Sequence, residues 1–297
     1  MKLKNIFTLL LPLFVTHLTR AQATLEVVTK TIEKILPYNA TGSILITGEN
    51  STIHVDRWEK PEVRIKVRLI TKHRIKSVAT EELENIKYLV EKKGNDIYLR
   101  NYFLSNEIKS TGCILKVEYE LTVPAQCNFI IKNNLGNVDI KNTEGRLTVE
   151  AKFGNINLSN VKGAVSINLS VGDIQANQIA GTTVVKANHA HIEMENLFGK
   201  YDLKLVNSDL SFKPINRIEQ LNVETKNGDV IYMLNNPEGY NYKLSTSYGE
   251  IKVPEIFKDK LHIEKNKALF ESFTKKNTGS PLNIKSEFGN ITLINNN

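Results

Sequence analysis

Carboxylates and one histidine recur at nearly equal intervals in the second half of the sequence, at Asp173, His191, Asp209 and Asp229. Such groups, held a few ångströms apart, can serve as general acid and base in the hydrolysis of a glycosidic bond. Asp and Asn are also frequent at turns, because they tolerate bent backbone conformations. The choice between these roles depends on the elements that carry the side chains.

Those elements belong to a repeat that divides residues 133–213 into nine units of nine residues without a gap. The fourth position of every unit is small and the eighth is apolar. Regularity over this length indicates a repeat architecture. The small positions are Gly136, Gly145, Gly154, Gly163, Gly172, Gly181, Ala190, Gly199 and Ser208.

The full period is eighteen residues, because every second unit opens on an amide. These amides are Asn142, Asn160, Gln178 and Asn196. Side chains on a strand alternate between two faces, and the apolar face changes parity at Gly172-Asp173 and again at Asn177-Gln178. A strand that changes its buried face must turn a corner, and Gly, Asn and Asp permit one. Each period therefore predicts a longer strand, a Gly-Asn/Asp corner, a short strand and an Asn corner.

Stacked periods of this kind form an all-β fold, a single-stranded parallel β-helix or β-solenoid with 18-residue coils, which we expect to be right-handed. We interpret the amides as structural, since stacked amides can bond to the coils above and below. The same structural role is predicted for the corner glycines Gly154, Gly172, Gly228 and Gly249.

Nine-residue repeats also build calcium-binding β-rolls, which need Asp at the sixth position and tandem glycines. The sixth position carries no carboxylate here, so neither calcium nor another cofactor is expected. The pair His189 and His191 suggests a metal site, but parity separates the two. His189 is expected to be buried in one column with Phe153, Val171 and Asn207, while His191 lies at the corner.

Residues 1–23 are predicted to be a signal peptide, because Lys2 and Lys4 precede an apolar run that ends near Ala21-Gln22-Ala23. We expect an exported protein, periplasmic, associated with the outer surface or secreted, with no transmembrane segment in the mature chain. Removal of the signal lowers the formal net charge from +7 to +4. Lysines and acids alternate without a basic block, so a nucleic-acid partner is not expected.

The mature chain divides into an N-terminal β-rich capping region, 24–132, and the solenoid repeats, 133–297, with a lateral loop at 254–280. Within the cap we expect an extended lead at 24–40 and one short helix, Ala79–Asn85, which Thr80 begins. A hairpin of Ile86–Glu91 and Asp96–Asn101 follows. Cys113 and Cys127 could form a disulfide in an oxidising compartment or remain two buried thiols.

Three motifs resemble a known family. They are the run Tyr119–Pro124 (YELTVP), the recurring Gly-[Asn/Asp/Glu]-Ile/Val corners and the final Ser286–Ile291 (SEFGNI). Together they resemble the exported bacterial β-solenoid domains of unknown function that are named "putative adhesin", and the signal resembles those of Bacteroidetes. The resemblance covers residues 40–297 and implies a parallel β-helix without an agreed active site.

Two functional hypotheses follow. The first is a non-enzymatic β-solenoid of the cell envelope, which acts as an adhesin or a scaffold for envelope proteins. The second is a carbohydrate-active enzyme or glycan-binding module that uses the acidic corner edge against surface glycans. Exposed aromatics along that edge would favour the second. Phe153, Tyr201 and Phe212 are expected to point inward, which favours the first.

Overall fold

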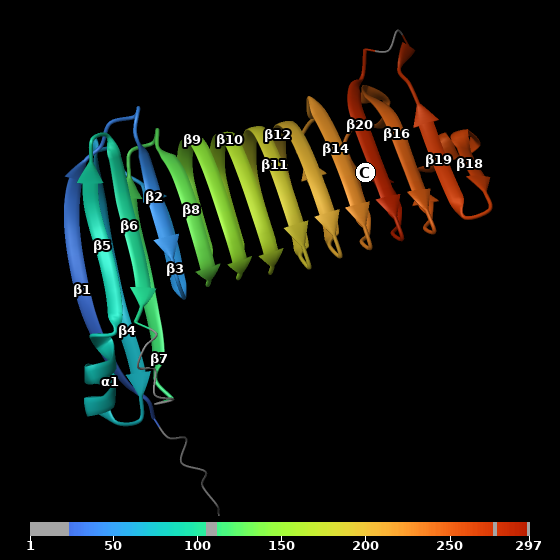
Figure 1. Cartoon of the computed structure of the whole chain (residues 1–297). Coiled ribbons are helices and arrows are strands. Elements are labelled where there is room, and N and C mark those ends of the chain that lie inside the picture. Colours follow the sequence, from blue (N-terminus) through green and yellow to red (C-terminus); the bar gives the residue numbers. More distant parts are fainter. Residues whose placement is uncertain (1–23, 105–111, 276–277, 296–297) are drawn as a thin grey trace, which may run out of the picture.

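A computed structural model of the protein describes residues 24–104, 112–275 and 278–295. The predicted signal peptide lies outside these residues. The described chain is an elongated stack of strands that widens at its N-terminal end (Figure 1). Its strands join one large network that is mixed in direction but largely parallel. The expectation of a mostly β fold is confirmed.

Four long strands form the centre of the stack: β9 (Val138–Phe153), β10 (Ile156–Val171), β11 (Ile174–Asn188) and β12 (His191–Val206). They pair in parallel, and Ile156 of β10 lies between Val138 of β9 and Ile174 of β11. Ile174 in turn pairs with Ile192. Residues eighteen positions apart in the sequence therefore lie in rows across the stack.

Each long strand bends where the backbone enters positive φ. In β10 the bends fall at Asn160 (φ 53°) and Gly163 (φ 117°), and a corner follows at Gly172 (φ 136°). The amides Asn142, Gln178 and Asn196 have φ between 56° and 58°. The bend at Gly163, repeated at Gly145, Gly181 and Gly199, was not assigned from the sequence, although every unit carried a small residue there.

Glycine is required at these bends because neighbouring coils approach closely. A Cβ atom on Gly163 would lie 2.2 Å from the carbonyl oxygen of Gly145, and one on Gly181 would lie 2.2 Å from that of Gly163. The corner glycines behave alike, since a Cβ on Gly172 would lie 2.1 Å from the Gly154 oxygen. Any side chain at these positions would push two coils apart.

The interior is a continuous column of side chains that is aliphatic in the centre and aromatic toward the C-terminus. Tyr201 packs edge-on against Phe212 with ring centroids 5.1 Å apart, and Phe212 stacks on Tyr232 at 5.6 Å. All three are fully buried. The inward orientation expected for Tyr201 and Phe212 is therefore correct.

The stack begins with a coil from early in the chain. Strands β2 (Ser43–Gly48) and β3 (Ser51–Arg57) pair in parallel with β8 (Asn128–Leu135) and β9. The expected division between residues 132 and 133 thus falls inside β8, and residues on both sides of it belong to the parallel stack. Position in space does not follow position in sequence at this end.

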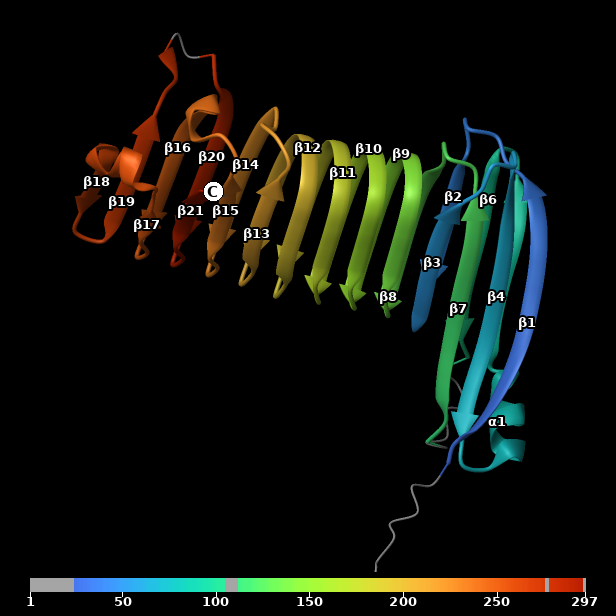
Figure 2. The ribbon, with the colours of Figure 1, turned by 180° about the vertical axis from the view of Figure 1, so that it is seen from behind.

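Strand β1 (Glu26–Pro37) and the segment between β3 and β8 together form the widened end (Figures 1 and 2). Strands β4 (Glu62–His73) and β7 (Ile114–Val123) extend the row of β3, and β1 pairs antiparallel with β4. Strands β5 (Ile86–Lys93) and β6 (Asp96–Phe103) form a hairpin that extends the row of β2. The lead expected at 24–40 is therefore mostly a strand.

Helix α1 (Lys76–Leu83) packs against β1 and β4. It begins earlier than expected, after Ile75, which has no side-chain capping bond, and Thr80 instead donates to the Lys76 carbonyl. The prediction that Thr80 starts the helix is wrong, because the buried residues Ala79 and Leu83 determine the packed turn rather than a polar cap.

Cys113 and Cys127 are thiols and do not form the disulfide that the sequence allowed. Cys127 is buried, and burial raises the pKa of its thiol to about 12. Cys113 is only partly buried.

The C-terminal end also departs from chain order. Strands β13 (Asp209–Pro214), β14 (Gln220–Lys226) and β15 (Val230–Leu234) continue the stack. The last strands of the chain, β20 (Ser280–Glu287) and β21 (Ile291–Asn295), come next in space. β20 pairs in parallel both with β14 and with β16 (Tyr240–Ser247), and β21 both with β15 and with β17 (Ile251–Lys252).

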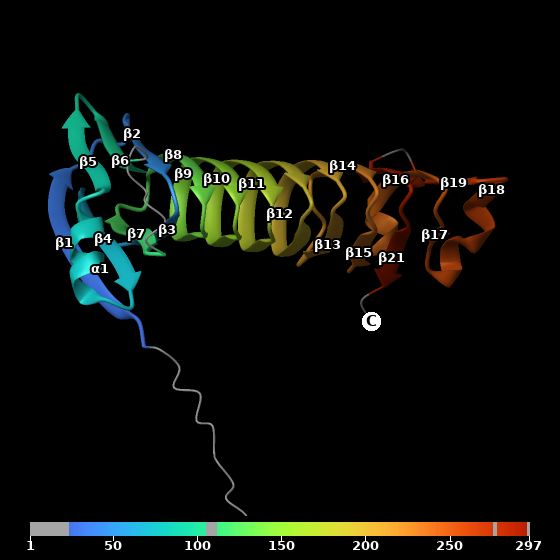
Figure 3. The ribbon, with the colours of Figure 1, turned by 60° about the horizontal axis from the view of Figure 1, so that its bottom comes forward.

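The prediction of a lateral loop at 254–280 is wrong. After the 3-10 turns Pro237–Gly239 and Glu255–Lys260, strands β18 (Leu261–Glu264) and β19 (Lys267–Ser272) fold over the end of the stack (Figures 1 and 3). β19 pairs antiparallel with β16. Phe257 and Phe270 close the core by packing on Tyr242, with ring centroids 5.5 and 5.6 Å away.

Two adjacent residues of β10 test the orientation of the stack. Ile167 is 1% exposed and Asn168 faces solvent. We expect Ile167→Asp to lower the free energy of unfolding by about 4 kcal/mol, because it buries an unpaired carboxylate. Asn168→Asp should change it by less than about 0.5 kcal/mol. Urea unfolding checks both, and equal midpoints would contradict the assigned faces.

Gly163→Ala tests the close approach of the coils. It should lower the melting temperature strongly or prevent folding, since the new methyl group meets the Gly145 oxygen. Gly94→Ala is the matched control: Gly94 also has positive φ (60°), but nothing lies within 4 Å of the place that its new methyl group would occupy. The control should cost only about 1 kcal/mol, and a comparable loss in both variants would argue that conformation alone requires glycine.

Candidate functional site

The acidic residues predicted from the sequence lie along one edge of the stack. We define the corner column as the residues that follow the small corner position in each coil: Asn137, Asn155, Asp173, His191, Asp209, Asp229, Asn290 and Glu250, in spatial order. The candidates Asp173, His191, Asp209 and Asp229 are all exposed. Asn290, from the end of the chain, separates Asp229 from Glu250.

Most side-chain oxygens of the corner column accept a hydrogen bond from the main chain of the next coil. Oδ1 of Asn155 accepts the N–H of Asp173 at 3.0 Å, and Oδ1 of Asp173 accepts the N–H of His191 at 3.3 Å. The same bond joins Asp209 to the Asp229 N–H at 2.8 Å. Asn and Asp are interchangeable in this ladder, because each hydrogen bond requires only one acceptor oxygen from the side chain.

His191 interrupts the ladder. Its Nε2 lies 3.3 Å from Oε1 of Glu193 on its own strand, and the N–H of Asp209 donates to the Ala190 carbonyl instead. The carboxylates of Asp173 and Asp209 are thus separated by one whole coil. They line none of five well-formed hollows on the described part of the molecule. Within that part, no group of three or more metal-ligating side chains is brought together.

The residues before the corner form a second column, the pre-corner column: Leu135, Phe153, Val171, His189, Asn207, Asn227, Phe288 and Tyr248. The prediction that His189 and Phe153 are buried is wrong. His189 is exposed, and Phe153 is 51% exposed. These residues lie where the strand already turns out of the sheet, so the two-residue alternation no longer determines which way they point.

The corner changes its conformation at Ala190. In the three coils before it the glycine itself has positive φ, at 112°, 131° and 136° for Gly136, Gly154 and Gly172. Alanine does not adopt this conformation readily, so positive φ moves to His189 (51°). Every later coil keeps that arrangement, at Asn207, Asn227, Tyr248 and Phe288. Asn207 and Asn227 suit it, since Asn tolerates the left-handed region.

Tyr248 and Phe288 are the exceptions in this series. They are 61% and 47% exposed, and their rings stack on each other with centroids 4.9 Å apart and planes 12° apart. A bulky side chain in the left-handed region costs roughly 1–2 kcal/mol. One aromatic pair contributes about 0.5–1.5 kcal/mol. The stacking energy by itself is smaller than the backbone strain of the two residues, whereas Asn at the same position in the neighbouring coils avoids most of that strain.

A hollow of about 460 Å³ adjoins Tyr248 of this pair. Its lining comes from the corner and from the turn between β18 and β19: Tyr248, Gly249, Glu250, Ile263, Lys265, Asn266, Lys267 and Asn290. The Asn266 carbonyl accepts the N–H of Tyr248 at 2.7 Å and holds that turn against the corner. Of these, Tyr248, Gly249, Glu250 and Asn290 belong to the repeated corner motifs of the sequence, while Ile263, Lys265, Asn266 and Lys267 carry no repeat signature.

The predicted amide column forms a partial ladder. Nδ2 of Asn160 donates to Oδ1 of Asn142 at 2.9 Å, and Nδ2 of Asn142 donates to Asp56 of the first coil at 2.9 Å. Further along, Asn196 donates to Asn177 rather than to Gln178. The amides thus connect coils at their bends, as a structural role requires.

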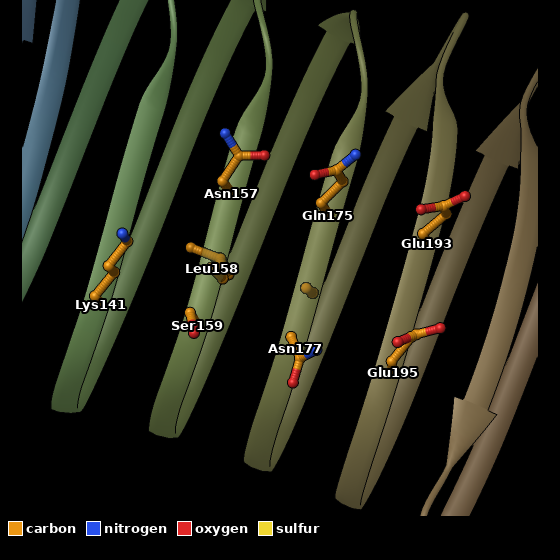
Figure 4. A pocket seen from close by; sticks show the side chains of 9 residues that line it. Lys141, Asn157, Leu158, Ser159, Gln175, Asn177, Glu193 and Glu195 are labelled. Atoms are coloured by element: carbon orange, nitrogen blue, oxygen red, sulfur yellow. The ribbon is translucent and has the colours of Figure 1, made fainter.

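The first segments of β9 to β12, which lie before the bends at the amides, have a polar and open outer face (Figure 4). Asn157, Gln175 and Glu193 lie side by side on β10, β11 and β12 and line a shallow hollow of about 330 Å³ with Lys141 and Glu195. At the N-terminal end of this row, His54 Nδ1 lies 3.0 Å from Asp139 Oδ2. This face carries no aromatic residue within the hollow.

The described residues contain no helix that is long and apolar enough to cross a membrane. The architecture and the laddered edge define the class of the protein: a stack of parallel β-strands whose corner residues join coil to coil.

The profile of the family described as Toastrack DUF4097 matches residues 44–294, and the chain belongs to that family. This agrees with the resemblance drawn from the corner motifs. No curated protein matches the chain.

Three solved structures match the chain over most of its length. A "putative adhesin" from Bacteroides fragilis is 12% identical, with a TM-score of 0.38 and coverage of 91% of this chain and 97% of that one. A "putative lipid binding protein" from Parabacteroides distasonis is 13% identical, with a TM-score of 0.36 and coverage of 90% and 96%. A "putative cell adhesion protein" from Clostridium sporogenes is 12% identical, with a TM-score of 0.26 and coverage of 90% and 100%.

Two substitutions at one corner residue separate hydrogen bonding from charge. Asp173→Asn keeps the acceptor oxygen for the His191 N–H and should leave the melting temperature nearly unchanged. Asp173→Ala removes the acceptor and should cost about 1 kcal/mol. Thermal unfolding at neutral pH measures both. A loss in the Asn variant as large as that in the Ala variant would mean that the negative charge matters, contrary to the ladder.

Proposed function

We propose that the protein is a non-enzymatic, exported component of a bacterial cell envelope that acts as an adhesin or as a scaffold for partner proteins. Its framework in this proposal is a single-stranded, right-handed β-solenoid with 18-residue coils. Export by the predicted signal peptide would deliver it to the periplasm, the outer surface or the medium. Its partners would be envelope proteins or surface glycans.

The observation that carries the non-enzymatic assignment is the use of the corner carboxylates. Asp173, Asp209 and Asp229 each accept a main-chain N–H from the next coil. A neutral Asn fills the same place at Asn155 and Asn290. A pair of catalytic carboxylates would instead need a cleft that holds the substrate between them, and these residues lie on an open edge.

The open faces support a docking role. Oppositely charged side chains pair across neighbouring coils, as Lys132 with Glu150 at 3.1 Å and Lys226 with Glu287 at 3.6 Å. Such exposed pairs contribute little to stability, so they can exchange partners when another polar surface approaches. A regular surface of mixed charge suits a broad protein contact better than a small-molecule substrate.

A glycan-binding module is the second candidate. The exposed ring pair of Tyr248 and Phe288 favours it, because the sequence hypothesis lacked an exposed aromatic surface at the corner edge and this pair supplies one.

The test uses the mature protein and the triple variant Asp173→Asn, His191→Asn, Asp209→Asn. Both are incubated with acidic and neutral polysaccharides, with and without divalent cations, and reducing ends are measured. We expect no cleavage by either protein. Cleavage by the parent that the triple variant loses would overturn the non-enzymatic assignment.

Capture from an envelope fraction complements this assay. Tagged parent and triple variant should retain the same proteins when analysed by mass spectrometry, because the substitutions preserve the fold and leave the outer strand faces unchanged. Retention of no envelope component by the parent would contradict the scaffold role.

A further inference from the structure

We propose that the C-terminal corner is a binding site for neutral saccharide chains, with Tyr248 and Phe288 as its aromatic surface. This inference rests on the second candidate function and assigns it a place and a ligand class. Three features of the corner carry it: the aromatic pair, the polar groups around that pair, and the contrast with an exposed ring elsewhere in the same column.

The first feature is the choice of residue. Asn207 and Asn227 occupy the same column and conformation as Tyr248 and Phe288, with φ of 48° and 56° against 62° and 59°. Asn satisfies this corner at low cost and bonds along the column, since Nδ2 of Asn227 donates to Oδ1 of Asn207 at 3.0 Å. The two final coils have Tyr248 and Phe288 in place of Asn, with exposed rings on a strained backbone. Strained backbone conformations are frequent at functional sites.

The second feature is the chemistry of the rim. Glu250 supplies carboxylate acceptors, while Lys265 and Lys267 supply cationic donors from the β18–β19 turn. Glu250 is exposed, and its contact with Lys252 is a loose 3.7 Å ion pair. Sugar hydroxyl groups both donate and accept, and the C–H face of a sugar ring packs on an aromatic ring. The Glu250 carboxylate would repel a phosphate group, and an acyl chain would need a deeper apolar cavity than this open hollow.

The third feature is the contrast with Phe153. This ring is 51% exposed in the same pre-corner column, but here the positive φ lies on the following Gly154 rather than on Phe153, and neither neighbour in the column is aromatic. Val171 and Leu135 lie on either side of it. Phe153 is therefore a matched control for an exposed ring without the polar hollow.

The experiment is affinity electrophoresis through gels containing dextran, laminarin or mannan as neutral probes, and alginate or polygalacturonate as acidic ones. The proteins are the parent, the double variant Tyr248→Asn, Phe288→Asn, and Phe153→Asn. We expect retardation of the parent by at least one neutral polymer. The double variant should lose about tenfold or more in affinity, as removal of central aromatic contacts does, while Phe153→Asn should stay within about twofold.

Thermal unfolding accompanies the binding assay. The double variant should melt at or above the temperature of the parent, because Asn suits the left-handed corner. A variant that fails to fold is replaced by Glu250→Ala, which removes a rim acceptor whose main-chain bond to Asn290 remains. This variant should bind more weakly while its melting temperature stays unchanged.

Three outcomes would overturn the proposal: no retardation of the parent by any neutral polymer, retardation by acidic polymers alone, or equal losses in Phe153→Asn and the double variant. Continued capture of envelope proteins by the parent in those cases would leave the scaffold function standing. Loss of that capture would remove the scaffold function independently.

Discussion

The contact that the rest of the structure depends on is the approach of glycine to glycine between coils. The carbonyl oxygen of Gly145 occupies the place where a side chain on Gly163 would begin, and the contact recurs with Gly163 and Gly181, then Gly181 and Gly199. This closeness keeps the parallel hydrogen bonds in register through the bends, where the two faces of the coil meet. That register aligns side chains eighteen residues apart in columns, both in the core and on the surface. A residue at a corner therefore lies next to, and can bond with, the corner residues eighteen positions away in the sequence.

The same dependence explains what could be predicted from the sequence. Rows such as Ile156, Ile174 and Ile192 were predictable, because neighbours in space are one period apart in the chain. The ends were not, because the first coil, Ser43–Arg57, and the last strands, Ser280–Asn295, join the stack across long insertions. The motif Ser286–Ile291 marked the last strands as part of the repeat but carried no information on their order, and the first coil was assigned to the capping region. Phe153 and His189 were misplaced because strand alternation was extended by one residue into a turn.

The change of corner at Ala190 has consequences beyond its own coil. A glycine with positive φ imposes little on the residue before it, so Leu135, Phe153 and Val171 can be apolar there. Once the left-handed residue moves one position back, that position favours Asn, and Asn207 and Asn227 follow. The later glycines Gly228, Gly289 and Gly249 are retained for close approach rather than for their own φ, since a Cβ on Gly289 would lie 1.9 Å from the Gly228 oxygen. The first coil, whose corner is Ser51 after Asn50 (φ 46°), has the same arrangement, so positive φ lies on the glycine only in the coils of Gly136, Gly154 and Gly172.

The arrangement of the corner residues also affects whether this edge suits catalysis or binding. Carboxylates at the corner are held by the next coil's N–H, which fixes them at the surface and keeps them apart by whole coils. Glycoside hydrolysis uses two carboxyl groups that flank one bond, and our proposal of a non-enzymatic role rests on the placement of these carboxylates along one edge. Recognition has no such requirement, because a saccharide chain that lies along an edge can meet one residue per coil. The last coils, where a terminal hairpin adds a second wall beside Tyr248, are where the edge first gains the concavity that selective binding needs.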